Sequence, residues 1–185
     1  MTLRAIIAIW CCFEIGLAVH DRIARREAVV RDTGSKALIL IAIALGLYLA
    51  FRVRGSSLAL TPEREVWWSY LAGVFMLLGL ATRIHAVIML RRYFTTTVTL
   101  RSEQPLVRSG LYRLIRHPGY LGSLLLFGGL GISMRSWLSV LILMVFVVPA
   151  FHYRIRIEEH AMHERFGAEY TKYRRATKRL VPWIY

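Results

Sequence analysis

Five stretches of apolar residues, each close to the length that a helix needs to cross a bilayer, dominate the sequence. They are Leu3–Val19, Ala37–Val53, Val66–Leu90, Gly119–Met134 and Trp137–Tyr153. A bilayer core requires about 20 apolar residues per helix, and it offers no water to unpaired backbone groups. The pattern therefore predicts an all-α, polytopic membrane protein with about five transmembrane helices in a single domain, residues 1–185. Only Arg135 and Ser136 separate the last two stretches, which predicts an antiparallel hairpin.

The composition supports a membrane protein over a soluble one. Hydrophobic residues make up 56% of the chain and charged residues 19%, whereas soluble domains have about 45–50% apolar and about 25% charged residues. The net charge of +14 would suggest nucleic-acid binding in a soluble protein. In a membrane protein, basic cytoplasmic loops account for it, so we expect contact with membrane lipids and none with nucleic acid.

The first apolar stretch contains a charged residue, Glu14. Neither this residue nor the sequence that follows fits a cleaved signal peptide, because no small-residue cleavage site precedes the basic loop. We therefore expect a retained helix. A carboxylate in a membrane helix is either paired, for which Arg83 is a candidate, or protonated, and a role in substrate binding is a further possibility.

Basic residues are distributed unevenly between the two sides of the predicted membrane. Loops 20–36 and 91–116 and the tail from residue 154 contain 19 Lys and Arg, against five in the N-terminus and the other two loops. The positive-inside rule then places the C-terminus in the cytoplasm. Segments His160–Phe166 and Tyr170–Tyr173 mix aromatic and charged residues, which predicts a partly buried or interfacial cytoplasmic helix.

Polar residues gather at the start of the fourth stretch, in Leu106–Tyr112 and Arg116–Gly122. Pro118 is well suited to the first turn of a helix, where its missing N–H would have no partner. His117 would then lie at a helix N-terminus, which favours anions. The alternative is that His117 only anchors the helix among lipid headgroups.

A second polar segment follows the fifth stretch. Arg154 and Glu158 are four residues apart and share one helical face, while Glu159 is turned about 100° away. They form either a weak surface ion pair or a charge pair at the mouth of a membrane cavity, where ionisable groups are usually functional.

Together the two segments resemble the isoprenylcysteine carboxyl methyltransferase family. They match its LV-x-x-G-x-Y-x-x-x-RHP-x-Y-x-G motif and, in order, its R-x-x-x-EE, FG-x-x-Y-x-x-Y and P motif, from about Tyr93 to Pro182. The family often has His two residues before the Leu-Val pair, where this chain has Gln104. The resemblance implies a membrane enzyme that moves a methyl group from S-adenosylmethionine to a lipophilic acceptor entering from the bilayer. The acceptor group would be the carboxylate of a prenylated cysteine or a similar anion.

By this resemblance the donor would bind to a set of residues from both segments: Gln104, Pro105, Leu106, Val107, Tyr112, His117, Pro118, Gly119, Tyr120 and Glu158. Arg154 matches the substrate-contacting arginine, and Arg154 and Glu158 would form the catalytic pair. A carboxylate acceptor is already ionised and needs no base, so Arg154 would neutralise and orient it. Residues 91–185 would form the catalytic half and residues 1–90 three supporting helices.

Other functions and sites remain open at this point. The scaffold could methylate a phospholipid, a thiol or another small molecule, act as a sterol-type NADPH reductase, or serve as a non-catalytic membrane scaffold; the oligomeric state is open. No metal site is expected, because His160 and His163 are three residues apart rather than four and no second cluster completes them. The glycines at 128, 129 and 131 favour close helix packing over a dinucleotide loop.

Overall fold

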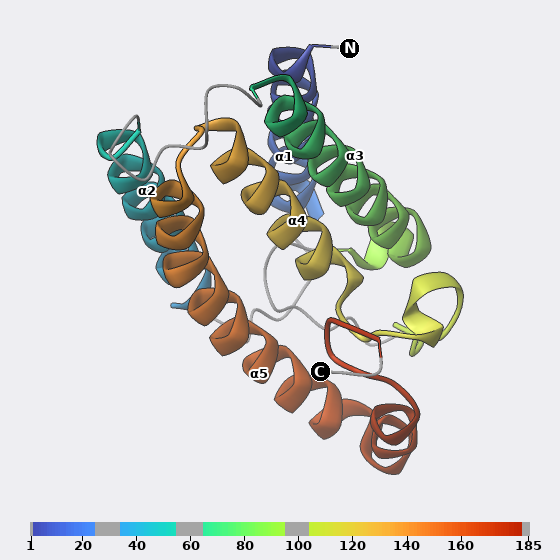
Figure 1. The fold of residues 1–185 in the computed structure, drawn as a ribbon. Helices are drawn as coiled ribbons and strands as arrows, with labels where there is room; N and C mark the ends of the chain where they lie inside the picture. Colours follow the sequence, from blue (N-terminus) through green and yellow to red (C-terminus); the bar gives the residue numbers. More distant parts are fainter. Residues whose placement is uncertain (1, 25–33, 55–64, 95–103, 183–185) are drawn as a thin grey trace.

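The computed structural model describes residues 2–24, 34–54, 65–94 and 104–182. Its helices are α1 (Leu3–Ala24), α2 (Ser35–Arg52), α3 (Glu65–Leu90), α4 (Pro118–Ser133) and α5 (Trp137–Ala176), with the short 3-10 turns η3 (Arg91–Tyr93) and η4 (Gly110–Arg113) (Figure 1). No strand occurs within these described ranges. The predicted all-α membrane fold is confirmed.

Four helices, α1, α2, α3 and α5, are long and apolar enough to cross a membrane. The fifth, α4, has 16 residues and is therefore about 24 Å long, somewhat short of the bilayer core of about 30 Å. Large apolar side chains such as Ile41, Leu141 and Val145 are exposed on the outside of the bundle. A bilayer is the solvent in which such an exterior is stable.

Helices α3 and α4 touch through glycines. A Cβ atom on Gly79 would lie 2.7 Å from the carbonyl oxygen of Gly122, and one on Gly129 would lie 2.8 Å from that of Ala72. Small residues let the backbones of membrane helices come into direct contact. Van der Waals packing then holds the helices together, since the hydrophobic effect does not drive association within a bilayer. The prediction that Gly129 serves helix packing is confirmed.

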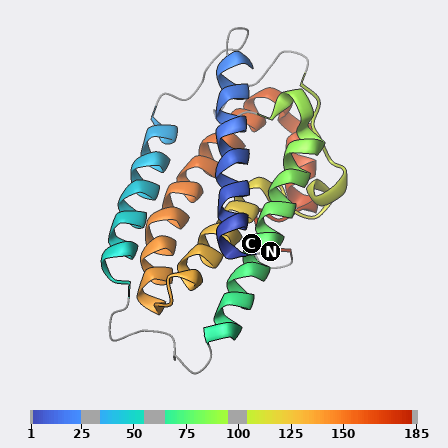
Figure 2. The same cartoon turned by 90° about the horizontal axis from the view of Figure 1, so that it is seen from above.

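The other helices surround this pair. Helix α2 lies along α5 (Figure 1), and the Ser139 hydroxyl on α5 donates a hydrogen bond to the Ala50 carbonyl oxygen on α2 (2.9 Å). Helix α1 lies between α2 and α3 when the bundle is seen from above (Figure 2). Trp10 on α1 packs edge-on against Phe127 on α4, with ring centroids 5.2 Å apart. Helices α4 and α5 form the predicted hairpin.

Helix α5 differs most from its prediction. It does not end near Tyr153 but continues to Ala176, with one break at Gly167, where φ is +50° and ψ is −120°. The expected tail helix is thus an extension of α5 that Gly167 redirects, since only glycine adopts this conformation readily. The chain then returns to the start of α4, where the backbone N–H groups of Arg116 and His117 donate to the carbonyl oxygens of Lys178 (2.8 Å) and Arg179 (3.0 Å).

Candidate active site

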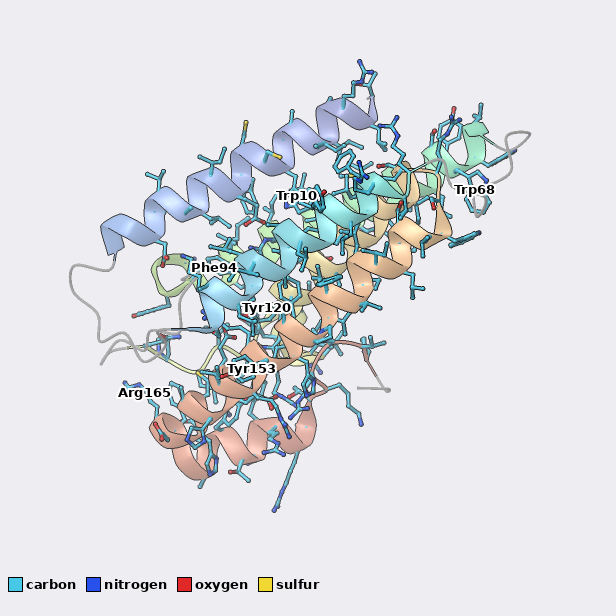
Figure 3. All side chains as sticks on the ribbon, turned by 90° about the vertical axis from the view of Figure 1, so that its left-hand side faces the viewer. Trp10, Trp68, Phe94, Tyr120, Tyr153 and Arg165 are labelled. Carbon is cyan, nitrogen blue, oxygen red and sulfur yellow. The ribbon has the colours of Figure 1, made fainter. Side chains whose placement is uncertain are left out.

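A cavity of about 680 Å³ opens where the five helices and the segment before η4 meet. Figure 3 labels Trp10, Phe94 and Tyr120, which come from three separate parts of the chain and contribute to its wall. The predicted site residues at the cavity wall are Gln104, Pro105, Leu106, Val107, Tyr112, His117, Gly119, Tyr120, Arg154 and Glu158. Pro118 is buried at the first position of α4, as predicted, and does not line the cavity.

The Glu158 carboxylate is the centre of the polar end of this cavity. Its Oε1 accepts hydrogen bonds from the Tyr120 hydroxyl (2.6 Å) and the Arg154 Nε (3.3 Å). Its Oε2 lies 3.6 Å from His117 Nδ1. The side chains singled out in the two motifs therefore meet, although 37 residues separate His117 from Arg154 in the sequence.

Arg154 is not a surface residue. It is 1% exposed, and its Nη1 donates a hydrogen bond to the Ser35 hydroxyl at the start of α2 (2.6 Å). Ser35 is itself buried. A guanidinium held at both Nε and Nη1 has a fixed orientation, which excludes the surface ion-pair interpretation. Sequence analysis did not identify Ser35, because the contact joins residues 119 positions apart.

Glu159 faces away from the cavity and binds the tail. Its Oε1 accepts a hydrogen bond from Arg116 Nε (2.9 Å), and its Oε2 accepts one from Arg179 Nη2 (2.8 Å). Arg116 also donates from Nη1 to the Thr177 carbonyl oxygen. This network fixes the returning tail against the start of α4, and no local pattern in the sequence revealed it.

His117 lies between the two neighbouring carboxylates, with its Nε2 3.6 Å from Glu159 Oε1. Burial alone would lower the pKa of His117, but Glu158 and Glu159 outweigh it and raise the pKa above the ordinary value of 6.5. A cation at this position offsets the repulsion between two adjacent acidic side chains.

The raised pKa of His117 predicts how stability depends on pH. A group with a raised pKa in the folded state contributes stability that is fully present below the unfolded value of 6.5 and is lost as pH rises through the folded value. The unfolding temperature should therefore fall as pH rises above 6.5 and through the raised pKa of His117. His117→Gln should not show this fall in thermal unfolding scans; an identical profile in both proteins would contradict the assignment.

Two buried polar atoms belong to residues that line the cavity. Among the described residues, the Gln104 Oε1 and the His117 Nε2 are buried without a hydrogen-bond partner. Buried polar groups are usually paired, so such atoms call for an explanation. A polar ligand in the cavity would satisfy Gln104 Oε1, whereas His117 Nε2 is directed at Glu159.

The histidines considered for a metal site, His160 and His163, do not line the cavity. His160 pairs with Glu164 (3.1 Å) on the surface. Among the residues that the structure describes, no group of three His, Cys, Asp or Glu side chains is placed to hold a metal ion.

Comparisons with known proteins agree with these features. Residues 71–164 match the isoprenylcysteine carboxyl methyltransferase (ICMT) family. The chain is 30% identical to a probable protein-S-isoprenylcysteine O-methyltransferase of Oryza sativa subsp. indica, covering 82% of each chain. It is 31% identical to protein-S-isoprenylcysteine O-methyltransferase A of Arabidopsis thaliana, covering 82% of this chain and 79% of the relative.

The fold is similar to that of a solved membrane enzyme. The structure of the eukaryotic intramembrane Ras methyltransferase ICMT superimposes with a TM-score of 0.65 at 20% identity, covering 97% of this chain and 66% of that one. The family match spans half of the chain, and the relatives match along most of it. The protein therefore belongs to the isoprenylcysteine carboxyl methyltransferase family of integral, multi-pass membrane enzymes.

Proposed function

We propose that this protein transfers a methyl group from S-adenosylmethionine to the carboxylate of a lipophilic acceptor, such as a prenylated cysteine, from the cytoplasmic side of the membrane. The observation that carries the proposal is the buried Arg154, held by Glu158 and Ser35 at the wall of a cavity between membrane helices. A cation with a fixed orientation in a largely apolar channel suits an anionic group on an otherwise apolar molecule.

The polar end of the cavity would hold the donor. S-adenosylmethionine would supply a methyl group already activated by its sulfonium. Gln104 would offer it a buried oxygen without a partner, His117 would offer the edge of its imidazole ring, and Glu158 would offer a carboxylate. Leu106 and Val107 would provide apolar contact. Pro118 would act by starting α4, and Pro105, Tyr112, Gly119 and Tyr120 would complete the wall.

The apolar end would hold the acceptor. Ile39, Ile43 and Leu47 on α2 line the cavity together with Ile7 on α1. A lipid chain could lie among these side chains while its carboxylate meets Arg154. The guanidinium would neutralise and orient the carboxylate for in-line attack, and exclusion of water would favour the reaction. In this arrangement residues 91–185 carry the donor site, and α1 and α2 from residues 1–90 complete the channel.

Binding of radiolabelled S-adenosylmethionine to the purified protein tests the donor assignment. His117→Ala should weaken this binding by about 1–3 kcal/mol, the effect of losing a partner at a buried polar site. His160→Ala is the matched control, since that side chain is 77% exposed, and should bind like wild type.

Binding of NADPH in place of S-adenosylmethionine would support a reductase instead, and binding of neither would support a scaffold. Methyl-transfer assays with prenylcysteine, phospholipid, thiol and amine acceptors would then identify the substrate.

The orientation is tested by labelling engineered cysteines in a chain whose native Cys11 and Cys12 are replaced by serine. Arg135 connects α4 to α5 and is exposed, as is Lys172 near the end of α5. A membrane-impermeant thiol reagent applied to intact cells should label Arg135→Cys but not Lys172→Cys. Labelling of both, or of Lys172→Cys alone, would contradict the proposed topology.

A further inference from the structure

Two charged side chains inside membrane helices are not used by the proposed mechanism. Glu14 on α1 and Arg83 on α3 form the ion pair that the sequence suggested. Arg83 donates hydrogen bonds from Nε to Glu14 Oε1 and from Nη2 to Glu14 Oε2 (2.9 Å). Both residues line the cavity. A paired guanidinium and carboxylate with this two-point geometry fixes the relative position of the helices that carry them.

The pair also contacts neighbours on both sides. On α1, Trp10 Nε1 donates to Glu14 Oε1 (3.2 Å). On the other side, Arg83 Nη1 donates to the Gly119 carbonyl oxygen in the first turn of α4 (3.2 Å). This is the turn that begins after His117 and carries Tyr120. A chain of hydrogen bonds thus runs from α1, through α3, to the proposed donor site.

Helix α1 contacts the rest of the bundle mainly through apolar side chains. Its contribution to the cavity wall is otherwise mainly apolar, and it packs chiefly against α3. A second ion pair, between Lys36 and Asp21 (3.1 Å), lies seven residues further along α1 and joins it to α2. Among the described residues, the Glu14–Arg83 pair is therefore a polar link between α1 and the turn of α4 that would bind the donor.

Stability alone is a weak explanation for such a pair. Replacing an ion pair in an apolar interior with apolar residues is often neutral or stabilising, and charged residues in membrane helices usually serve a function. We infer that Glu14 and Arg83 are positioning residues that hold the α1 wall of the acceptor channel in register with the donor-binding turn of α4. This inference rests on the proposed function for the identity of the two ligands.

Three variants separate the two contacts of Arg83. Glu14→Gln removes the ion pair but leaves the Arg83 contact with Gly119. The double variant Glu14→Gln, Arg83→Met removes both contacts without leaving an unpaired charge, which protects folding. The exchanged pair, Glu14→Arg with Arg83→Glu, restores the link between α1 and α3 but has no donor for the Gly119 carbonyl oxygen. Cys12→Ser, an exposed residue of α1 that does not line the cavity, is the control.

Each protein is reconstituted in lipid nanodiscs, and deuterium uptake by α1, acceptor KM and S-adenosylmethionine Kd are measured. In Glu14→Gln, the α1 amide hydrogens should exchange with deuterium about tenfold faster than in wild type. Acceptor KM should rise about tenfold, while donor Kd should stay within about twofold of the wild-type value. The double variant should also raise donor Kd by at least about fivefold. The exchanged pair should restore α1 protection and acceptor KM but not donor Kd.

The outcomes distinguish this inference from the proposed function. Unchanged α1 exchange in Glu14→Gln, or a parallel rise of acceptor KM and donor Kd in that variant, would overturn the positioning role. If the wild type binds no S-adenosylmethionine, the proposed function fails, while α1 exchange still decides whether the pair holds the helix.

Discussion

Replacing Arg154 with methionine is expected to lower kcat/KM by about 1,000-fold, or about 4 kcal/mol of transition-state stabilisation. The acceptor carboxylate would then enter an apolar cavity without a counter-charge, and a buried charge that loses its partner is destabilised by about this amount. Arg154→Lys keeps the charge but loses the planar two-point geometry. Its kcat/KM should fall by about 10- to 100-fold.

Steady-state kinetics and donor binding measured on the same preparations test this expectation. Arg156→Met is the matched control, because Arg156 lies on the same helix but is exposed, and it should behave like wild type. Donor affinity should change little in either Arg154 variant, since the His117 segment and Glu158 remain. A loss of donor binding in parallel with activity would instead make Arg154 a clamp for Glu158 and reopen thiol and amine acceptors.

Replacing Glu159 with alanine is expected to destabilise the protein by about 3–5 kcal/mol, the effect of removing one member of a buried ion pair. Its side chain is 7% exposed and pairs with both Arg116 and Arg179. The substitution would leave the cation at Arg116, itself 7% exposed, without its carboxylate. Thermal unfolding scans should show a decrease of roughly 6–20 °C in the midpoint.

Glu169→Ala provides the comparison for Glu159. Glu169 pairs with Arg108 at 2.6 Å, but the two side chains are 59% and 40% exposed. Exposed pairs contribute little to stability, because water screens both charges. Equal destabilisation by the two substitutions would show that burial of Glu159 does not matter and would contradict the proposed tail network.

Local regularities made most of the fold predictable. Uninterrupted apolar stretches predicted the membrane helices, because length and hydropathy are properties of the sequence itself. The fifth apolar stretch ends at Tyr153, whereas α5 continues to Ala176, because the charged residues that follow the stretch also form a helix readily. The break lies at Gly167. Beyond it the tail contacts the start of α4, and such a tertiary contact cannot be read from the local sequence.

The site was predictable to the extent that its contacts are local or matched a known motif. Arg154 and Glu158 are neighbours on one helix, and the family resemblance joined them to His117 and Tyr120. Ser35 could not be predicted, because serines are common at helix starts and its contact with Arg154 spans the whole fold. Contacts between residues far apart in the chain produce no periodic pattern in the sequence.

The return of the tail to the start of α4 has a consequence for biosynthesis. Residues 178 and 179 follow all five helices in the chain, yet their carbonyl oxygens pair with the backbone at Arg116 and His117. Synthesis proceeds from the N-terminus at about 5–20 residues per second, so the membrane helices emerge before this segment does. Insertion of the first helices into the bilayer can therefore begin before this contact exists. A chain that ended at Ala176 would contain all five helices but would lack the two residues whose carbonyl oxygens accept from Arg116 and His117 at the start of α4.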